Sequence, residues 1–150
     1  MTTTLIRRLG RTDREAARAM FGVMAHVFEE HAEPLGDDYL DRLLARDDFW
    51  ALAAFADERE PEVVGGLTAH TLPMTRSESA ELFIYDLAVR ADRQRSGIGR
   101  ALVGALRELA ANAGIAVVFV PADDDDHHAL EFYRAVGGTP SPVTFFTFGE

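Results

Sequence analysis

The sequence predicts one domain of mixed α/β type, in which a single sheet is built in the order β-α-α-β-β-β-α-β-α-β. Short apolar runs typical of buried strands recur along the chain, and segments with helical spacing of apolar residues separate some of them. A length of 150 residues fits one domain, and no internal repeat or low-complexity segment divides it. Residues 1–150 are therefore predicted to fold together.

The first elements are a strand and two helices. Residues 4–9 predict the strand. Thr12 and Glu15 have the spacing of a capping box, which indicates a helix start, and the apolar periodicity continues to about His31. One of the aspartates at 37–38 is then expected to cap a second, shorter helix.

Three strands are predicted next. Residues 49–55 and 63–72 are apolar and flank a charged turn at residues 57–62, so they predict a hairpin. A polar loop at residues 74–79 leads to a third apolar run at residues 81–89. This third strand carries an acidic residue near its middle, which makes it a candidate for part of a site.

The last elements alternate between helix and strand. Residues 97–113 predict a helix, residues 115–120 a strand, residues 126–136 a helix and residues 143–148 a final strand. The apolar face of the first of these helices is predicted to consist of Ala101, Leu102, Ala105, Leu106 and Leu109.

Composition excludes several classes of function. The chain has no cysteine, which excludes disulfides and a cysteine nucleophile, and its fifteen basic residues are all arginine, which excludes a P-loop lysine. A net charge of −10 argues against a nucleic-acid partner and suits a cationic small molecule. No apolar run has the length of a membrane span, and no signal peptide is recognised, so we expect a cytoplasmic protein. The histidines are too poorly grouped to predict a metal site.

An anion site is predicted where the strand ending at Val89 meets the following helix. The connecting turn is rich in arginine, and Gly97 and Gly99 open the helix. The first amides of a helix have no partner within it, and together with the helix dipole they attract an anion. Glycine lets a phosphate approach the backbone closely. The spacing fits neither a Rossmann turn nor a Walker loop, since a third glycine and a lysine are missing.

The sequence Gln94-x-x-Gly97-x-Gly99, placed between an apolar strand and an amphipathic helix, resembles the acetyl-CoA signature of the GNAT superfamily of N-acetyltransferases. The predicted order of elements is similar to that superfamily over the whole chain. The resemblance implies direct transfer of acetyl from acetyl-CoA to a primary amine. It also implies that residues 87–89 leave the neighbouring strand and pair with pantetheine, and that the amides of residues 95–100 hold the pyrophosphate. The implied cofactor-binding residues are Leu87, Ala88, Val89, Gln94, Arg95, Ser96, Gly97, Ile98, Gly99 and Arg100.

A narrower resemblance rests on residues 84–89 and 93–98, with residues 38–40 and 49–55. These segments are similar to the type I aminoglycoside (gentamicin) 3-N-acetyltransferases, whereas the loop at residues 29–36 departs from that pattern. The resemblance implies acetylation of the 3-amino group of 2-deoxystreptamine, and with it antibiotic resistance. Another amine, such as a polyamine or a protein N-terminus, stays open as the acceptor, and so does a CoA-binding module without turnover. Dimers are common in that family, but the residues leave the oligomeric state open.

Two residues are candidates for proton transfer. The resemblance places Tyr133 beside the CoA sulfur, where a phenol with an ordinary pKa near ~10 is protonated at neutral pH and can protonate the thiolate. Asp86 is the candidate base, in the strand next to the acetyl group. Strict alternation would put Asp86 on one face with Leu82 and Ile84, and only a bulge would change this.

Carboxylates are expected to bind the cationic acceptor. One residue of the run at 123–126 is expected to cap the following helix, and the others lie where α/β sheets open toward ligands. The candidate substrate-binding residues are Glu81, Asp86, Asp123, Asp125 and Asp126.

Overall fold

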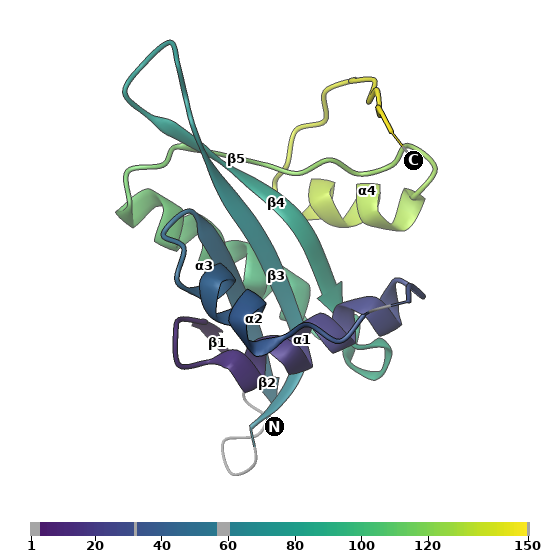
Figure 1. Cartoon of the computed structure of the whole chain (residues 1–150). Helices are drawn as coiled ribbons and strands as arrows, with labels where there is room; N and C mark the ends of the chain where they lie inside the picture. Colours follow the sequence, from purple (N-terminus) through teal and green to yellow (C-terminus); the bar gives the residue numbers. More distant parts are fainter. Residues whose placement is uncertain (1–3, 32, 57–60, 150) are drawn as a thin grey trace.

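A computed structural model describes residues 4–31, 33–56 and 61–149, and Figure 1 shows its arrangement. Five strands form one sheet in the order β1-β2-β3-β4-β5. Neighbours are antiparallel up to β4, and β5 runs parallel to β4. The strands are β1 (Thr4–Arg8), β2 (Phe49–Ala56), β3 (Glu62–Pro73), β4 (Ala80–Val89) and β5 (Val117–Phe119). The helices are α1 (Arg14–Val27), α2 (Asp37–Leu44), α3 (Ile98–Asn112) and α4 (His127–Ala135), with a 3-10 turn at Ala91–Arg93.

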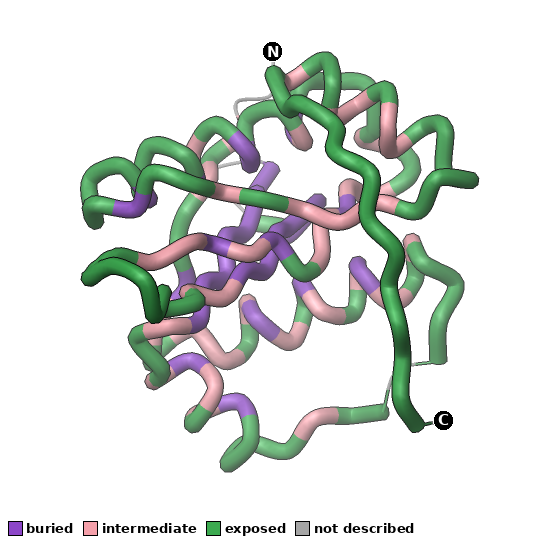
Figure 2. Tube along the Cα trace, turned by 90° about the horizontal axis from the view of Figure 1, so that it is seen from above, coloured by how far each residue is buried: buried purple, intermediate pink, exposed green. Residues whose placement is uncertain are grey.

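The sheet is covered on both faces. One core cluster joins it to α3, and a second joins it to α1 and α2. All eight residues of β2 are buried, because this strand lies between β1 and β3 and has helices on both sides. In Figure 2 the buried residues are the purple stretches of the trace, which lie mostly in the central strands. The predicted mixed α/β class and the order of elements up to α4 are thus confirmed.

A close approach between α1 and β3 depends on a glycine. A Cβ added at Gly66 would lie 2.2 Å from Cγ and Sδ of Met20 and 3.2 Å from the carbonyl oxygen of Leu52. Met20 is fully buried, so its side chain has no free space to enter. The absence of a side chain at Gly66 therefore lets α1 lie directly on the sheet.

The predicted capping box at the start of α1 is wrong. The helix begins at Arg14, and the residue before it, Asp13, accepts hydrogen bonds from the amide of Gly10 at 2.7 Å and from Arg7 at 2.9 Å. Glu15 pairs with Arg18 instead of returning to the helix start. Arg7 binds the carboxylate of Asp13 and Arg18 binds that of Glu15, so neither carboxylate caps the helix. The helix also ends at Val27, earlier than expected.

Asp37 does not cap α2, which begins after Gly36. Asp37 accepts a hydrogen bond from Arg18 at 2.7 Å, and Asp41 binds Arg14 through both carboxylate oxygens at 3.0 and 2.6 Å. Bidentate arginine–carboxylate pairs have defined geometry. These pairs hold α2 against α1. They therefore fix the end of the connecting loop at which α2 begins.

Three further expectations differ from the structure. The buried face of α3 is rotated from the predicted one and consists of Ile98, Leu102, Val103, Leu106 and Ala110. The strand predicted at residues 115–120 is only three residues long. Of the charged turn predicted at residues 57–62, residues 57–60 lie outside the described residues. Within the described ranges, no helix is long and apolar enough to cross a membrane.

The strand predicted at residues 143–148 does not form. This stretch pairs with no strand among the described residues, and its four large apolar side chains are between 70% and 95% exposed. Strand-like composition needs a partner strand before it becomes a strand, and this part of the chain has none beside it.

Candidate active site

β4 and β5 separate after a short stretch of pairing. Residues 81–83 of β4 pair with residues 117–119 of β5, and β5 gives no partner to β4 beyond Phe83. Figure 1 shows the two strands diverging from this point. The predicted splay is therefore confirmed. It leaves the backbone groups of Leu87, Ala88 and Val89 on that edge without a strand to pair with, and such groups need a partner.

A bulge decides which way the acidic side chain of β4 faces. Thr68 of β3 pairs with Asp86, but the next residue, Ala69, pairs with Ile84, so Tyr85 is an extra residue in β4. Before the bulge, Ile84 enters the core under α3; after it, Ala88 enters the core under α1. Asp86 therefore shares the α1 face of the sheet with Ala88, and strict alternation from Ile84 does not hold.

The turn between β4 and α3 has the geometry of an anion site. Gln94 donates a hydrogen bond from Nε2 to the carbonyl oxygen of Val89 at 2.9 Å, which ties the turn to the end of the strand. Arg95 and Gly97 both have positive φ, 62° and 88°. Left-handed residues within a turn direct successive amides toward one concave side. The first bond within α3 runs from the amide of Ala101 to the carbonyl of Gly97 at 3.0 Å, so the amides of residues 98–100 remain available.

Glycine at position 99 brings the start of α3 against α4. A Cβ there would lie 3.0 Å from the ring of Phe132. Close by, Arg100 donates a hydrogen bond from Nη2 to the carbonyl of Ala135 at 3.0 Å. The side chain of Arg100 thus positions α4, and its amide remains available to a phosphate. This contact also fixes the helix that carries Tyr133.

The arginines of the turn fall into two groups. Arg90 is bound to Glu62 at 2.6 Å and to Asp92 at 2.6 Å, and so it is part of the scaffold. Arg93 and Arg95 form no ion pair with any residue that the structure describes. Their positive charge is available beside the free amides.

The pKa values of the two predicted catalytic residues, Tyr133 and Asp86, are both raised. Burial, and then the charges of Asp126 and Asp86, raise the pKa of Tyr133 to about 12. The pKa of Asp86 is also raised, first by burial and then by the charge of Glu30, and His70 acts in the opposite direction. Tyr133 therefore stays protonated at neutral pH, and Asp86 is a stronger base than an ordinary aspartate. The charges of Asp86 and Asp126 thus both act on Tyr133, and the catalytic roles of Asp86 and Tyr133 stay predictions.

The sequence analysis did not predict that Glu30 and His70 act on Asp86. Glu30 lies just after α1 and His70 lies in β3, so only the folded chain brings them to Asp86. A histidine inside an otherwise apolar strand was the available signal for His70.

His70 belongs to a row of aromatic rings that crosses four strands. Ring centroids are 5.3 Å apart for Phe49 and His70, 5.7 Å for His70 and Tyr85, 6.0 Å for Tyr85 and Phe83, and 5.1 Å for Phe83 and Phe119. Such separations are those of favourable edge and tilted contacts. This aromatic row was not predicted, because it depends on the register between strands.

The other predicted carboxylates lie in the connection before α4 and in β4. Asp126 accepts a hydrogen bond from the amide of Ala129 at 3.0 Å, which confirms that one residue of the acidic run caps α4. Asp123 and Asp125 are exposed in the connection before the cap. Glu81 is two residues from Phe83 and shares its face of β4, at the paired end of the strand. Among the described residues, no group of three potential metal ligands occurs.

The model of the acetyltransferase (GNAT) family matches residues 16–137 of the chain. The chain belongs to the GNAT acetyltransferase family. A comparison with curated proteins gave no match. Among solved structures, this GNAT chain is 32% identical to the aminoglycoside acetyltransferase meta-AAC0020 from an uncultured soil metagenomic sample, with a TM-score of 0.92 and coverage of 98% of this chain and 96% of that one. That relative was solved in complex with trehalose and with sisomicin.

Two further structures resemble this GNAT chain. The aminoglycoside acetyltransferase HMB0005, also from an uncultured soil metagenomic sample, is 31% identical with a TM-score of 0.87, and each chain covers 99% of the other. The enzyme AAC(6')-Iy, solved with a CoA bisubstrate analogue, is 17% identical with a TM-score of 0.79 and the same coverage, and this likeness shows the fold alone.

Membership of the family identifies the donor. GNAT acetyltransferases use acetyl-CoA, and this chain is an acetyltransferase that takes acetyl-CoA as its cosubstrate. The free amides at residues 98–100, the positive φ of Arg95 and Gly97, and the uncommitted guanidinium groups of Arg93 and Arg95 fit its diphosphate. The binding roles of Gln94, Ser96 and the other individual residues stay predictions.

Proposed function

We propose that the protein transfers acetyl from acetyl-CoA to the 3-amino group of the 2-deoxystreptamine ring of an aminoglycoside, directly and within a ternary complex. The observation that carries this proposal is the half-buried Asp86, which lies on the α1 face of β4, next to the unpaired edge of the strand, and whose charge acts on Tyr133. A base, an acid and unpaired backbone amides are what acetyl transfer to an amine requires.

The proposed reaction assigns one role to each group. The amine nitrogen attacks the thioester carbonyl carbon, the C–N bond forms and the C–S bond breaks. The proton lost by the amine passes to Asp86, directly or through water. The departing thiolate takes a proton from Tyr133, which solvent then restores. An amide near Val89 polarises the carbonyl oxygen while negative charge develops on it.

The proposal of an aminoglycoside acceptor is supported by two relatives that are more than 30% identical over nearly the whole chain. It is also supported by charge, since a net charge of −10 attracts a polycation over long range. Glu30 and Asp86 lie at the site, and Glu81, Asp123 and Asp125 are proposed to bind further ammonium groups. The aromatic row supplies apolar area, with Tyr85 64% exposed, on which the C–H face of a sugar ring can rest.

The most specific part of the proposal is which amino group of the aminoglycoside is acetylated. Position 3 rests on the likeness of residues 84–89 and 93–98 to type I 3-N-acetyltransferases. The alternative is the 6'-amino group, and the two products differ in which carbon-bound protons shift in an NMR spectrum.

A panel of acceptors tests the proposal. Gentamicin, sisomicin and neamine are incubated with acetyl-CoA and enzyme, thiol release is followed, and each product is located by NMR. Spermine and a peptide with a free N-terminus serve as comparison amines. We expect turnover with the aminoglycosides, acetylation at position 3, and a KM that rises with salt while kcat stays constant. Turnover with spermine or the peptide alone contradicts the acceptor class, and a product acetylated at the 6' position contradicts the regiochemistry.

A further inference from the structure

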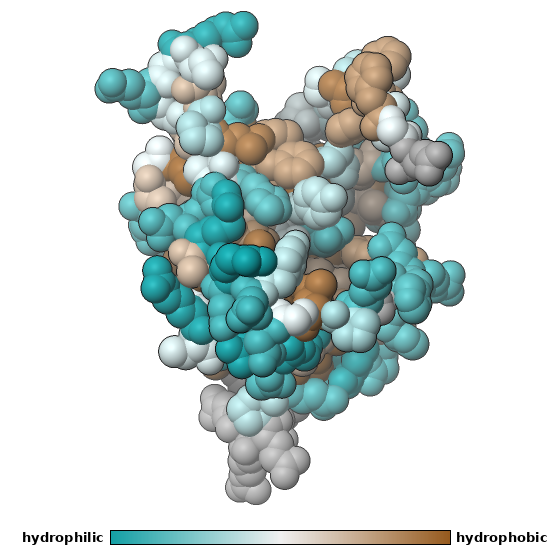
Figure 3. All heavy atoms as spheres, in the orientation of Figure 1, coloured by the Kyte–Doolittle hydropathy of each residue, from teal (hydrophilic) through white to brown (hydrophobic). Residues whose placement is uncertain are grey.

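The exposed end of the aromatic row lies beside the proposed base. The row consists of Phe49, His70, Phe83, Tyr85 and Phe119, and it begins under α1 and α2, where Phe49 is buried. It ends in the open, where Tyr85 is 64% and Phe119 is 38% exposed. Figure 3 shows apolar surface beside the projecting β3–β4 hairpin, in the recess between the hairpin and the C-terminal end of the chain. Contiguous exposed apolar surface often marks a binding site.

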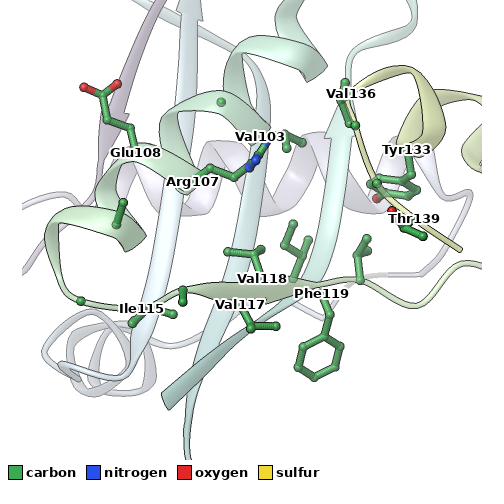
Figure 4. Close-up of a pocket in the computed structure, with 18 residues that line it drawn as sticks. Val103, Arg107, Glu108, Ile115, Val117, Val118, Phe119, Tyr133, Val136 and Thr139 are labelled. Carbon is green, nitrogen blue, oxygen red and sulfur yellow. The ribbon is translucent and has the colours of Figure 1, made fainter. Parts of the chain in front are cut away.

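Strand register fixes the face of the sheet on which the aromatic row lies. Phe49 pairs with His70, and Phe83 pairs with both His70 and Phe119. Paired residues share one face of a sheet, and Phe49 packs in the core cluster under α1 and α2. Figure 4 shows the ring of Phe119 on the side of β5 opposite to Val103 of α3. The aromatic row therefore lies on the α1 face, which is also the face of the proposed base.

The bulge in β4 places the ring of Tyr85 and the carboxylate of Asp86 side by side. Tyr85 contacts the rings of His70 and Phe83 at centroid distances of 5.7 and 6.0 Å, so it lies on the α1 face. Asp86 lies on the same face because Tyr85 is the extra residue of the bulge. In a regular strand, two successive side chains would point to opposite faces. The bulge thus brings an exposed aromatic ring next to the proposed base.

The ring of Tyr85 is held in position although most of it is exposed. His70 and Phe83 meet it at interplanar angles of 78° and 71°, which are those of edge contacts. A ring that its neighbours already hold loses little conformational freedom when a ligand covers it. The face of an aromatic ring carries negative potential, which attracts C–H groups and nearby cationic groups. Tyr85 therefore offers a preorganised surface to the C–H face of a sugar that carries ammonium groups.

We propose that Tyr85 is a specificity-determining residue, on which the amino sugar joined to carbon 4 of 2-deoxystreptamine rests. This inference rests on the proposed function, in which the 3-amino group approaches Asp86. Carbon 4 is bonded to carbon 3, so the sugar that it carries lies beside the reacting amine. Tyr85 is one residue from Asp86, about 3.3 Å along the strand, so ring and base match the adjacent positions of sugar and amine. The site thus prefers 2-deoxystreptamine substituted at carbon 4 over the free ring.

A pair of ligands and a series of variants test this contact. Neamine carries an amino sugar at carbon 4, and 2-deoxystreptamine lacks it. Thiol release gives kcat/KM for both acceptors, and calorimetry with coenzyme A present gives both affinities without turnover. We expect Tyr85→Ala to lower the affinity and kcat/KM for neamine about 10-fold. It should change the values for 2-deoxystreptamine by less than about 2-fold. Tyr85→Phe keeps the ring and should retain the wild-type preference for neamine.

Leu5→Ala is the matched control. Leu5 is 55% exposed and pairs with the core residue Phe55, so it lies on the same face of the sheet, at the opposite edge. Three results would each overturn the proposal: equal losses for both ligands in Tyr85→Ala, no loss for neamine, or the same loss in Leu5→Ala. If Tyr85→Ala does not fold, Tyr85→Val decides, because valine favours a strand and also lacks the ring.

The same data separate this inference from the proposed function. If wild-type enzyme binds neamine but does not acetylate its 3-amino group, the proposed function is wrong, and weaker binding by Tyr85→Ala would still support the contact. If neamine is acetylated at that amine equally well by wild type and Tyr85→Ala, the proposed function stands and the contact is wrong. No binding of neamine by the wild type contradicts both.

Discussion

The replacement of Asp86 by asparagine tests the chemistry of the site most sharply. Asparagine has the same shape but accepts no proton, so Asp86→Asn removes the proposed base and leaves the fold of β4 in place. Loss of a general base lowers the rate by about 100- to 10,000-fold. We expect kcat in the thiol-release assay to fall within this range, and the affinity for acetyl-CoA in calorimetry to stay unchanged, because the phosphates are proposed to bind at residues 95–100.

The pH dependence of this activity has a defined sign. Burial and the charge of Glu30 raise the pKa of Asp86, so kcat/KM should fall as the pH drops through that raised value. Glu30→Gln removes a negative charge, lowers the pKa of Asp86, and should move the acid limb to lower pH. His70→Gln removes a positive charge and should move it to higher pH. Each shift should be smaller than about 1 pH unit, because solvent screens these charges.

The outcome that refutes this assignment is specific. If Asp86→Asn keeps wild-type turnover with the same acid limb, or if Glu30→Gln and His70→Gln shift that limb in the same direction, the base is another group. No alkaline limb from Tyr133 is expected in the range where the enzyme is stable, since the pKa of Tyr133 is about 12.

Other substitutions probe the donor side and the scaffold. Tyr133→Phe should lower kcat about 10-fold without changing acetyl-CoA affinity, because water can replace the lost acid; an unchanged kcat would remove Tyr133 from the mechanism. Gly97→Ala forces a Cβ into a φ of 88°, at a strain of about 1–2 kcal/mol, and calorimetry should show weaker acetyl-CoA binding. Gly66→Ala drives a Cβ into Met20 and should lower the free energy of unfolding by about 1–3 kcal/mol in urea. Gly22→Ala, at an exposed position in α1 with open space around it, should raise it by about 0.5–1 kcal/mol.

Local chemistry made much of the fold predictable from the sequence. Apolar runs identified four of the five strands closely, and Gly97 marked the start of α3 to within one residue. The cap of α4 by Asp126 was also predictable, because capping depends on residues three positions apart. The start of α1 was not, since Asp13 is held by Arg7 and Gly10 through contacts that compete with the Thr12 pattern.

The parts of the site that escaped prediction depend on register. The bulge at Tyr85 turns Asp86 to the α1 face, and neither residue type nor spacing in β4 signals it. His70 and Glu30 reach Asp86 only through the pairing of β3 with β4 and the position of α1. The segment at residues 143–148 was predicted as a strand on its composition, but among the described residues it lies beside no strand with which it pairs. Local pattern predicted the turn proposed to bind acetyl-CoA, whereas long-range pairing builds the face proposed for the acceptor.

A crystal structure of the complex with coenzyme A tests the central claim, which is that backbone amides at the start of α3 hold the diphosphate. We expect diphosphate oxygens within about 2.7–3.2 Å of the amides of Ile98, Gly99 or Arg100, and pantetheine along the unpaired edge of β4. A diphosphate bound elsewhere, with this turn occupied by the protein's own side chains, would contradict the account.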